Sequence, residues 1–319
     1  MIELNEILSK SETILISGAS GFIGFNFSRY VLENSNIKIY AYREGEVNKE
    51  NNFRIAALNR YSNFFLADSK ENVFSITRKI SLVINFASYG VDSSQKNFNE
   101  LLNGNISFAL KMLDFARYFD SKFIHTATCY EYEDSTDLLT ENHKLQPDSL
   151  YGSFKAATSI IIKESAKTLG VDFVILRLFG VYGPYESGKK LLPYLYSKLN
   201  FKEKAKLTAG IQIRDYTYVN DIVNAFLIAG FNKTNFVEYN ICSGVGIRIK
   251  DFATKFCKIN EYDESLLEFG KKDFSENTYP RMIGSNKRFF EEFGWKPKTK
   301  LSDGFLQVNN YFLKSGQNN

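Results

Sequence analysis

The chain has few of the residues from which disulfide frameworks and metal sites are built. Its 319 residues include three cysteines, Cys129, Cys242 and Cys257, and two histidines, His125 and His143. Three scattered cysteines within or after apolar runs are too few for a disulfide framework or a zinc site. We therefore expect buried thiols, no metal, and a cytoplasmic protein that works in a reducing environment.

Long hydrophobic segments are also absent. No run of eighteen apolar residues occurs, so we expect no spanning helix and no membrane partner. The first ten residues carry two acids and no apolar core, unlike a signal peptide. The net charge is only +4 and no basic stripe stands out, so we expect no nucleic-acid partner.

Short β-rich apolar runs alternate with amphipathic segments through the first half of the chain. This alternation is typical of a parallel sheet with helices on both faces. We expect helices over 97–118 and 151–169. The expected strands are 13–17, 37–42, 63–66, 82–86, 122–127 and 172–178, with a seventh at 237–241. The predicted fold is α/β, a Rossmann-type doubly wound parallel sheet with a smaller mixed α/β substrate-binding domain. The larger domain is expected to hold 1–182 and 216–243, and the smaller one 183–215 and 244–319.

A glycine-rich loop follows the first predicted strand. The segment GASGFIG places glycines at Gly18, Gly21 and Gly24. Gly18 permits a tight turn, Gly21 lets backbone N–H groups approach a pyrophosphate, and Gly24 lets the next helix pack closely on the strand. The amino terminus of that helix, from Phe22, then faces the anion. At the first strand–helix junction of a βαβ pattern, this spacing predicts a dinucleotide site.

An ordered series of motifs continues along the chain. They are NFAS (85–88), TATCY (126–130), YGSFK (151–155), RLFGVYGP (177–184), GIQIRDYTYVND (210–221) and FGWKP (293–297). With the glycine loop, this series resembles the extended short-chain dehydrogenase/reductase family, in its NAD(P)-dependent nucleotide-sugar epimerase, dehydratase and reductase group. The resemblance covers nearly the whole chain.

The loop and the resemblance together imply a set of cofactor contacts. An acid at the end of the second strand would bind the ribose of NAD, but Ala41, Tyr42 and Arg43 stand there. A missing acid beside an arginine favours NADP(H). NAD(H) is the alternative if Glu44 reaches back to the ribose. The expected cofactor-binding residues are Gly18, Ser20, Gly21, Phe22, Ile23, Gly24, Arg43, Asp68, Ser69, Phe86, Ala87, Ser88, Asn105, Tyr151, Lys155 and Leu178.

Three residues form the expected catalytic set. Tyr151 and Lys155 are four apart on a predicted helix and so share a face. We expect the Lys155 ammonium to lower the pKa of the phenol, which would exchange a proton with a sugar oxygen. The resemblance implies that Thr126 binds that oxygen, with Thr128 as the second candidate. Family dehydratases carry Asp and Glu where this chain has Ala127 and Thr128, so 4,6-dehydration is disfavoured.

The leading interpretation is an NADPH-dependent 4-ketoreductase of a nucleotide-linked 6-deoxy sugar, in the biosynthesis of bacterial-type surface-polysaccharide sugars. The sugar resembles those of dideoxyhexose synthases of the abequose and paratose type. An NAD-dependent C4 epimerase is the second interpretation, and a non-catalytic dinucleotide-sensing protein is the third. The expected substrate-binding residues are Tyr89, Gly90, Thr126, Thr128, Tyr151, Arg214 and Arg281.

The resemblance also implies a homodimer. Family members pair through the two helices expected at 97–118 and 151–169, which form a four-helix bundle. Apolar residues on more than one face of a helix fit such pairing. The candidates for the outer face are Leu102, Phe108, Met112 and Phe115.

Overall fold

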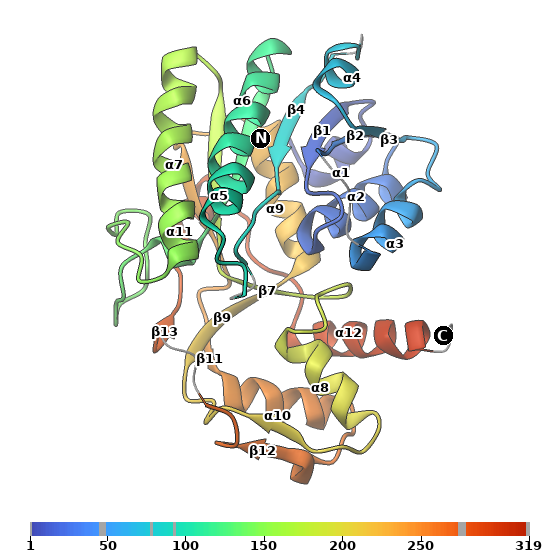
Figure 1. The fold of residues 1–319 in the computed structure, drawn as a ribbon, viewed down its shortest axis with the longest axis vertical. Helices are drawn as coiled ribbons and strands as arrows, with labels where there is room; N and C mark the ends of the chain where they lie inside the picture. Colours follow the sequence, from blue (N-terminus) through green and yellow to red (C-terminus); the bar gives the residue numbers. More distant parts are fainter. Residues whose placement is uncertain (1, 45–48, 77–78, 92–93, 274–278, 317–319) are drawn as a thin grey trace.

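The computed structural model describes residues 2–44, 49–76, 79–91, 94–273 and 279–316. A central sheet with helices on both faces forms the larger part of the molecule (Figure 1). A smaller layer of short strands and helices lies beyond one end of this sheet and includes α12 (Leu301–Gly316).

The central sheet has seven strands in the order β10-β6-β5-β4-β1-β2-β3, and all neighbours are parallel. All seven predicted strands are confirmed, with ends that differ by at most one residue. The strand order reverses between β1 and β4, and in such sheets the ligand crevice lies at the carboxyl ends of those strands. The strands are β1 (Thr13–Ser17), β2 (Lys38–Tyr42), β3 (Phe64–Ala67), β4 (Leu82–Asn85), β5 (Lys122–Thr128), β6 (Phe173–Leu178) and β10 (Glu238–Ile241).

Apolar cores on both faces hold the helices to the sheet. On one face, Phe27 and Phe226 pack with Ile16 of β1. On the other face, Ile162 packs with Leu15 of the same strand, as the alternation of side chains along a strand requires. The doubly wound α/β architecture is therefore confirmed. The helices that supply these cores are α2 (Phe22–Asn34) and α9 (Val219–Phe231) on the first face, and α6 (Phe108–Tyr118) and α7 (Leu150–Leu169) on the second.

The helix predicted over 97–118 contains a change of winding. It begins as α5 (Phe98–Leu101), continues as a π-helix over 102–107, and returns to α-helix in α6. A π turn holds one more residue than an α turn, which rotates the later residues about the axis. The placement of Met112 and Phe115 on an outer face is wrong, because both are fully buried against the sheet. Leu102 is exposed and Phe108 is half-buried.

The smaller layer is built around two short sheets. The first holds β7 (Gly180–Tyr182), β9 (Ile213–Tyr218), β11 (Gly246–Arg248) and β13 (Arg281–Met282), and the second holds β8 (Ala205–Leu207) and β12 (Leu267–Phe269). Their core includes Tyr182 and Phe252. The division into two domains with the bounds given above stays a prediction. The other helices are α1 (Leu4–Leu8), α3 (Lys49–Leu58), α4 (Lys70–Phe74), α8 (Leu191–Leu199), α10 (Ile249–Ile259) and α11 (Lys287–Phe293), with 3-10 turns at Cys129–Glu131 and Glu264–Leu266.

The cysteines behave as expected. All three are buried and free, and burial raises the pKa of the Cys129 thiol to about 12. A search of the described residues for three or more His, Cys, Asp or Glu side chains able to hold a metal found no such group. Within the same residues, every helix is too short or too polar to cross a membrane.

Candidate active site

The loop between β1 and α2 has the backbone geometry that a dinucleotide cradle needs. Gly18 has a φ of +70°, and a Cβ there would lie 2.7 Å from the Ala87 nitrogen. A Cβ on Gly24 would lie 2.3 Å from the Gly18 carbonyl oxygen, so the helix packs where only glycine fits. Gly21 is the N-cap of α2, and no side chain caps this helix. The first N–H groups of α2 are thus left for an anionic group.

Asn105 holds the loop that follows β4. Its buried Oδ1 accepts hydrogen bonds from the Ser88 hydroxyl at 3.0 Å and from the Tyr89 nitrogen at 3.2 Å, and its Nδ2 donates to the Tyr89 carbonyl at 2.9 Å. The next residue, Gly90, has a φ of +96° and lies against Tyr151, since a Cβ there would be 3.3 Å from Cδ2 of the ring. Asn105 therefore positions Ser88, Tyr89 and Gly90 beside the expected catalytic tyrosine.

The structure brings the three expected catalytic residues together at the end of β5. Ser149 caps α7 by accepting a hydrogen bond from the Gly152 nitrogen at 3.0 Å, which starts the helix one residue before Tyr151. Lys155, one turn later, is buried and donates through Nζ to the Thr126 carbonyl at 2.6 Å. Among the described residues, the buried Oγ1 of Thr126 has no hydrogen-bond partner. This hydroxyl can therefore bind an oxygen that enters the site.

Burial sets the protonation states of these groups. Desolvation raises the pKa of Tyr151, although the neighbouring Ser88 hydroxyl lowers it in part. Desolvation also lowers the pKa of the Lys155 ammonium to about 8, and the Glu131 carboxylate acts in the opposite direction. The expected lowering of the phenol pKa by Lys155 is thus absent, because Lys155 binds the Thr126 carbonyl and the burial of the phenol dominates. Burial therefore favours the neutral form of both the Tyr151 phenol and the Lys155 amine.

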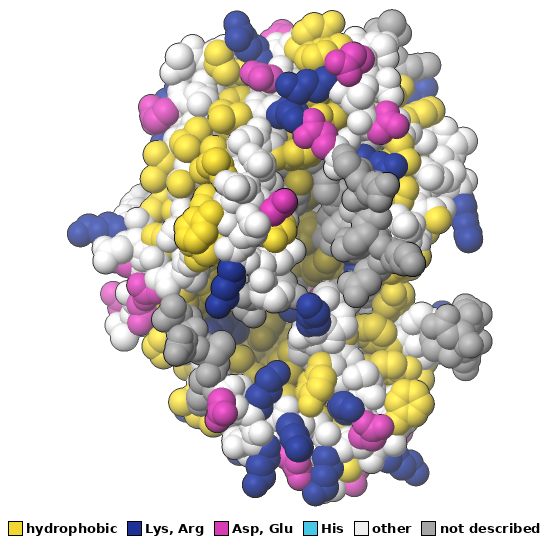
Figure 2. Space-filling view, viewed as in Figure 1, with side chains coloured by type: hydrophobic (Ala, Val, Ile, Leu, Met, Phe, Trp, Pro, Cys, Tyr) yellow, Lys and Arg dark blue, Asp and Glu magenta, His cyan; other side chains and the backbone are white. Residues whose placement is uncertain are grey.

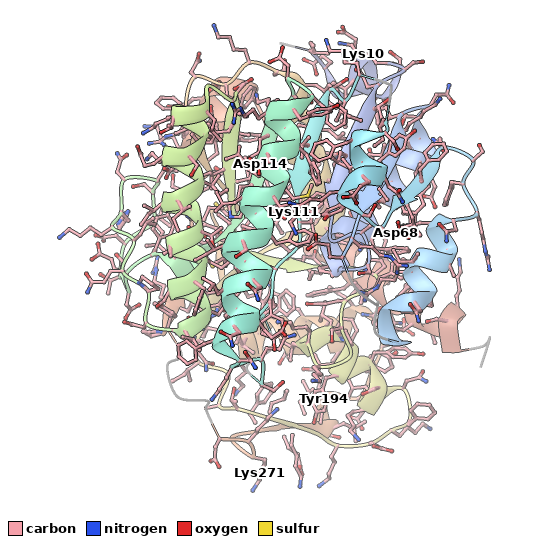
Figure 3. The ribbon with its side chains drawn as sticks, turned by 45° about the horizontal axis from the view of Figure 1, so that its top comes forward. Lys10, Asp68, Lys111, Asp114, Tyr194 and Lys271 are labelled. Atoms are coloured by element: carbon pink, nitrogen blue, oxygen red, sulfur yellow. The ribbon has the colours of Figure 1, made fainter. Side chains whose placement is uncertain are left out.

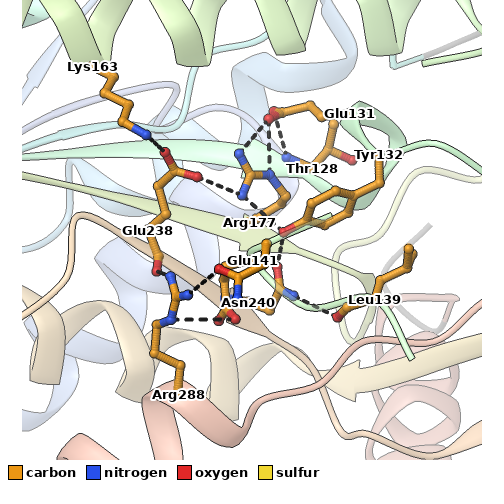
Figure 4. Close-up of polar contacts among 11 residues, drawn as sticks. Thr128, Glu131, Tyr132, Leu139, Glu141, Lys163, Arg177, Glu238, Asn240 and Arg288 are labelled. Atoms are coloured by element: carbon orange, nitrogen blue, oxygen red, sulfur yellow. Dashed lines mark hydrogen bonds and ion pairs between the residues drawn. The ribbon is translucent and has the colours of Figure 1, made fainter. Parts of the chain in front are cut away.

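A buried ion pair supports the end of the catalytic strand (Figure 4). Arg177 on β6 and Glu131 are both fully buried, and Arg177 Nε donates to Glu131 Oε2 at 3.0 Å. Glu131 Oε1 accepts from the Thr128 nitrogen at 3.1 Å, and Thr128 Oγ1 accepts from the Tyr130 nitrogen at 3.4 Å. Thr128 thus forms a capping box with the turn at 129–131. This engagement makes Thr126 the better candidate for binding a sugar oxygen.

The same arginine connects to a wider network (Figure 4). Arg177 Nη1 also donates to Glu238 on β10 at 3.4 Å, and Lys163 of α7 donates to the other Glu238 oxygen at 2.6 Å. Arg288 of α11 donates to the Glu238 carbonyl at 3.1 Å and pairs with Glu141 at 3.7 Å. This network therefore connects β6, β10, α7 and α11.

Aromatic and basic side chains surround the residues that were predicted to bind substrate. The Tyr130 ring lies edge-on to the Tyr151 ring at 6.5 Å; burial raises the pKa of the Tyr130 phenol, and the neighbouring Arg214 lowers it in part. Arg214 Nη2 also donates to the Tyr279 carbonyl at 2.7 Å. On the adjacent strand β13, the Arg281 Nε is buried with no hydrogen-bond partner within the described part of the chain. Figure 2 shows this face hollowed between the two layers, with Lys and Arg side chains at the rim.

Two residues of this region were not among the predicted ones. Tyr130 is the last residue of the TATCY motif, in which roles were expected only for Thr126 and Thr128. Glu186 follows the RLFGVYGP segment, and burial raises the pKa of its carboxyl to about 8. Burial raises the pKa of the Tyr216 phenol on β9, and the nearby Glu186 and Tyr130 raise it further. An acid placed directly after this motif is the signal that could have identified Glu186.

The end of β2 has an arginine that is available to an anionic ligand. Within the described residues, the buried Nε of Arg43 has no hydrogen-bond partner. The carboxylate of Glu44 accepts from the Tyr42 hydroxyl and from Lys111 of α6, so it is engaged by the protein. Figure 3 shows Lys111 on α6 and Asp68 beyond β3 at this end of the molecule.

The other residues predicted to contact the cofactor differ in how exposed they are. Asp68 is exposed and Ser69 caps α4 by accepting from the Asn72 nitrogen at 3.1 Å. Phe86 packs its ring 4.9 Å from Phe226 in the core, so only its backbone can face a cofactor. Leu178 is likewise buried in the core. Ser20, Phe22 and Ile23 lie at the start of α2 and are half-buried.

Comparison with known proteins gives the family. A model of the NAD dependent epimerase/dehydratase family matches residues 14–242, which is most of the chain. The chain therefore belongs to this family and is an enzyme of the oxidoreductase or epimerase kind. The resemblance found in the sequence motifs is confirmed.

Individual relatives share the whole length of the chain at low identity. CDP-abequose synthase of Salmonella typhimurium is 28% identical, over 93% of this chain and 97% of the relative. The dTDP-glucose 4,6-dehydratase of Haemophilus influenzae is 24% identical, over 94% and 97%.

Solved structures agree on the fold. The dTDP-glucose 4,6-dehydratase of Bacillus anthracis in complex with NAD has a TM-score of 0.83 at 22% identity, with 96% of this chain and 98% of that chain covered. The UDP-glucose 4-epimerase of Thermotoga maritima with UDP-glucose has a TM-score of 0.82 at 24% identity, with 95% and 99% covered.

Proposed function

We propose that the protein uses NADPH to reduce the 4-keto group of a nucleotide-linked 6-deoxy sugar, in the biosynthesis of bacterial-type surface-polysaccharide sugars. The observation that carries this proposal is geometric: Lys155, one helical turn after the half-buried Tyr151, binds the Thr126 carbonyl, and within the described residues the Thr126 hydroxyl has no hydrogen-bond partner. A phenol that keeps its proton suits a reduction, in which the sugar oxygen must gain one. The similarity to a CDP-abequose synthase agrees with this class of sugar.

Elimination of water is disfavoured by the residues that follow Thr126. Ala127 is buried and has no acid–base group. Thr128 is engaged in the capping box. The acid that follows in the chain, Glu131, is fully buried and paired with Arg177, so it cannot act as a base on a substrate carbon. The site retains proton transfer to oxygen but has no evident group for removing water across two carbons.

The residues at the crevice fit a dinucleotide. The Gly18 and Gly24 positions are filled by backbone where any Cβ would clash, and the uncapped start of α2 can accept a pyrophosphate. When bound, the dinucleotide supplies the hydride. In this proposal Lys155 would hold the cofactor ribose and Thr126 would orient the sugar oxygen. Arg43, with an unused Nε, suits a 2′-phosphate.

A C4 epimerase with NAD(H) is the second candidate. Its support is that structures of a 4,6-dehydratase and of a UDP-glucuronic acid 4-epimerase, both in complex with NAD, are similar to this chain. The same three residues would serve, since an epimerase oxidises and re-reduces one carbon. The engagement of Glu44 by Lys111 leaves the ribose of NAD without the acid that would bind it, which favours the reductase.

The test is single-turnover reduction of a nucleotide-linked 4-keto-6-deoxy sugar, followed by loss of NADPH absorbance. We expect faster oxidation of NADPH than of NADH, and Arg43→Gln should weaken binding of NADPH but not of NADH. Tyr118→Phe, an exposed tyrosine on α6, is the matched control for Tyr151→Phe. If NADPH is not oxidised with any such ketone while C4 epimers interconvert, the epimerase replaces the reductase.

A further inference from the structure

A cavity of about 530 Å³ lies outside the candidate active site, between α2, the segment after β7, and α12. A second cavity of about 200 Å³ shares Arg29 and Tyr185 with it and extends toward α3. The larger one has the size of a small-molecule site. No predicted catalytic or cofactor residue lines either cavity. The residues that line the larger one are Arg29, Pro184, Tyr185, Tyr218, Asn220, Gln307, Asn310, Tyr311, Lys314 and Ser315.

The charge of the larger cavity suits an anion. Its lining includes Arg29 and Lys314 and no acidic residue. The Nε of Arg29 is buried and makes no hydrogen bond among the described residues. The carboxylate paired with it, on Glu33, is 3.9 Å away and accepts a hydrogen bond from Tyr61 at 3.0 Å. Arg29 Nη1 donates to the Tyr185 hydroxyl at 3.5 Å, and the other N–H groups of the guanidinium can donate to a phosphate, which guanidinium groups bind well.

The wall of the cavity suits a planar ring. The Tyr185 ring lies 4.2 Å from the Tyr311 ring and 4.6 Å from the Phe25 ring, and the Arg29 guanidinium lies 5.2 Å from its centroid. Tyr185 has a φ of +67°, a left-handed conformation that is strained for this residue. Arg54 fixes it by donating to its carbonyl at 2.6 Å. These contacts hold an aromatic surface in place beside the cation.

Amide side chains complete the lining. Gln307, Asn310 and Asn220 each offer hydrogen-bond donors and acceptors. Gln307 uses its oxygen to accept from the Tyr218 hydroxyl at 2.6 Å, which leaves its amide N–H groups directed elsewhere. Amides of this kind can bind the edge of a nucleobase, while tyrosine rings stack on its face.

We propose that this cavity, the Arg29–Tyr311 cavity, binds a nucleoside phosphate. The phosphate contacts Arg29, the base stacks on the tyrosines, and the amide side chains contact its edge. The site is separate from the expected nucleotide-sugar site, whose arginines Arg214 and Arg281 lie on β9 and β13.

Calorimetric titration of the NADPH-saturated protein with cytidine, uridine, thymidine and adenosine monophosphates tests the proposal. We expect two equivalents of at least one nucleotide. Arg29→Gln should weaken one of the two sites at least ten-fold, and Arg214→Gln should weaken only the other. Asn310→Ala, at an exposed position of α12, should weaken the same site as Arg29→Gln by a smaller factor. Arg117→Gln, at an exposed position of α6, is the matched control and should change neither site.

The competing outcomes are distinct. A single equivalent that responds to Arg214→Gln and not to Arg29→Gln overturns the proposal. Inorganic phosphate bound at the Arg29 site as tightly as any nucleotide also overturns it, because the rings and amides would then have no role. Turnover measured without added nucleotide should be unchanged in Arg29→Gln, so the result does not depend on which sugar the enzyme reduces.

Discussion

Removing one partner of the buried Arg177–Glu131 ion pair should greatly lower the free energy of unfolding, and removing the second partner as well should restore most of it. Arg177→Met removes the guanidinium and keeps most of the side-chain volume. Glu131, which is fully buried and lies 3.0 Å from Arg177, then loses its counter-charge. Glu238 is less affected because Lys163 still pairs with it at 2.6 Å. The loss of stability therefore comes mainly from Glu131, because its buried carboxylate cannot be solvated by water once Arg177 is gone.

The expected loss of stability can be taken from other buried ion pairs that have lost one partner. Removing one partner of a buried pair costs about 3–5 kcal/mol, because an uncompensated charge remains inside. At about 2 °C for each kcal/mol in a chain of this length, the midpoint of thermal unfolding should fall by roughly 6–10 °C. An exposed pair gives the comparison. Lys198 and Glu203 lie 2.6 Å apart with both side chains partly in solvent, and Lys198→Met should cost no more than about 1 kcal/mol.

Urea unfolding of the single and double variants measures these differences. Glu131→Leu combined with Arg177→Met removes both charges, and we expect it to recover most of the stability that either single change loses. If Arg177→Met costs no more than Lys198→Met, the pair is not the desolvated contact described here. A double variant that is as unstable as the sum of the two singles would refute the charge argument and assign the loss to packing.

Four further outcomes are expected. Tyr151→Phe should reduce single-turnover reduction by about 10²–10⁴-fold with little change in dinucleotide affinity; a near-native rate would show that another group donates the proton. Lys155→Met should abolish turnover yet stabilise the dinucleotide-free protein at pH 7 by up to about 3 kcal/mol, the free-energy equivalent of lowering the lysine pKa from 10.5 to about 8, with the gain vanishing above pH 10.5 in urea unfolding. Gly24→Ala should lower the unfolding midpoint and abolish the rise that NADPH produces in the parent, because the new Cβ would lie 2.3 Å from the Gly18 oxygen. Sedimentation should show a homodimer at micromolar concentration that Leu102→Glu, at an exposed position before α6, converts to monomer.

The sheet could be predicted because its signals are local. Each strand is a short apolar run with turn or helix residues on both sides, and the glycine loop has a spacing that few other structures need. The roles of Gly18 and Gly24 followed from backbone geometry alone, and the structure has that geometry. Tyr151 and Lys155 were proposed because they lie four residues apart on a predicted helix that follows the fifth strand, and the structure has that helix.

Other features depend on contacts between distant residues. Arg177 and Glu131 are 46 positions apart, and nothing in either segment marks them as partners. Tyr130 and Glu186 reach the site from different segments, so their shared environment exists only in the folded chain. The π turn at 102–107 left no trace in the apolar pattern that was used. The outer-face assignment of Met112 and Phe115 failed because the apolar pattern does not show which face of α6 meets the sheet.

The burial of Lys155, an expected catalytic residue, makes the stability of the folded protein depend on pH. Its pKa is about 8 when folded, against 10.5 for the free side chain, so the unfolded chain binds more protons between these values. Stability contributed by this group therefore rises as pH increases from 8 to 10.5 and is lowest below pH 8. At neutral pH the buried Lys155 ammonium therefore lowers the free energy of unfolding. The Thr126 carbonyl and the Glu131 carboxylate reduce that cost, and Arg177 in turn holds Glu131. The buried network is accordingly part of what keeps a charged lysine beside Tyr151.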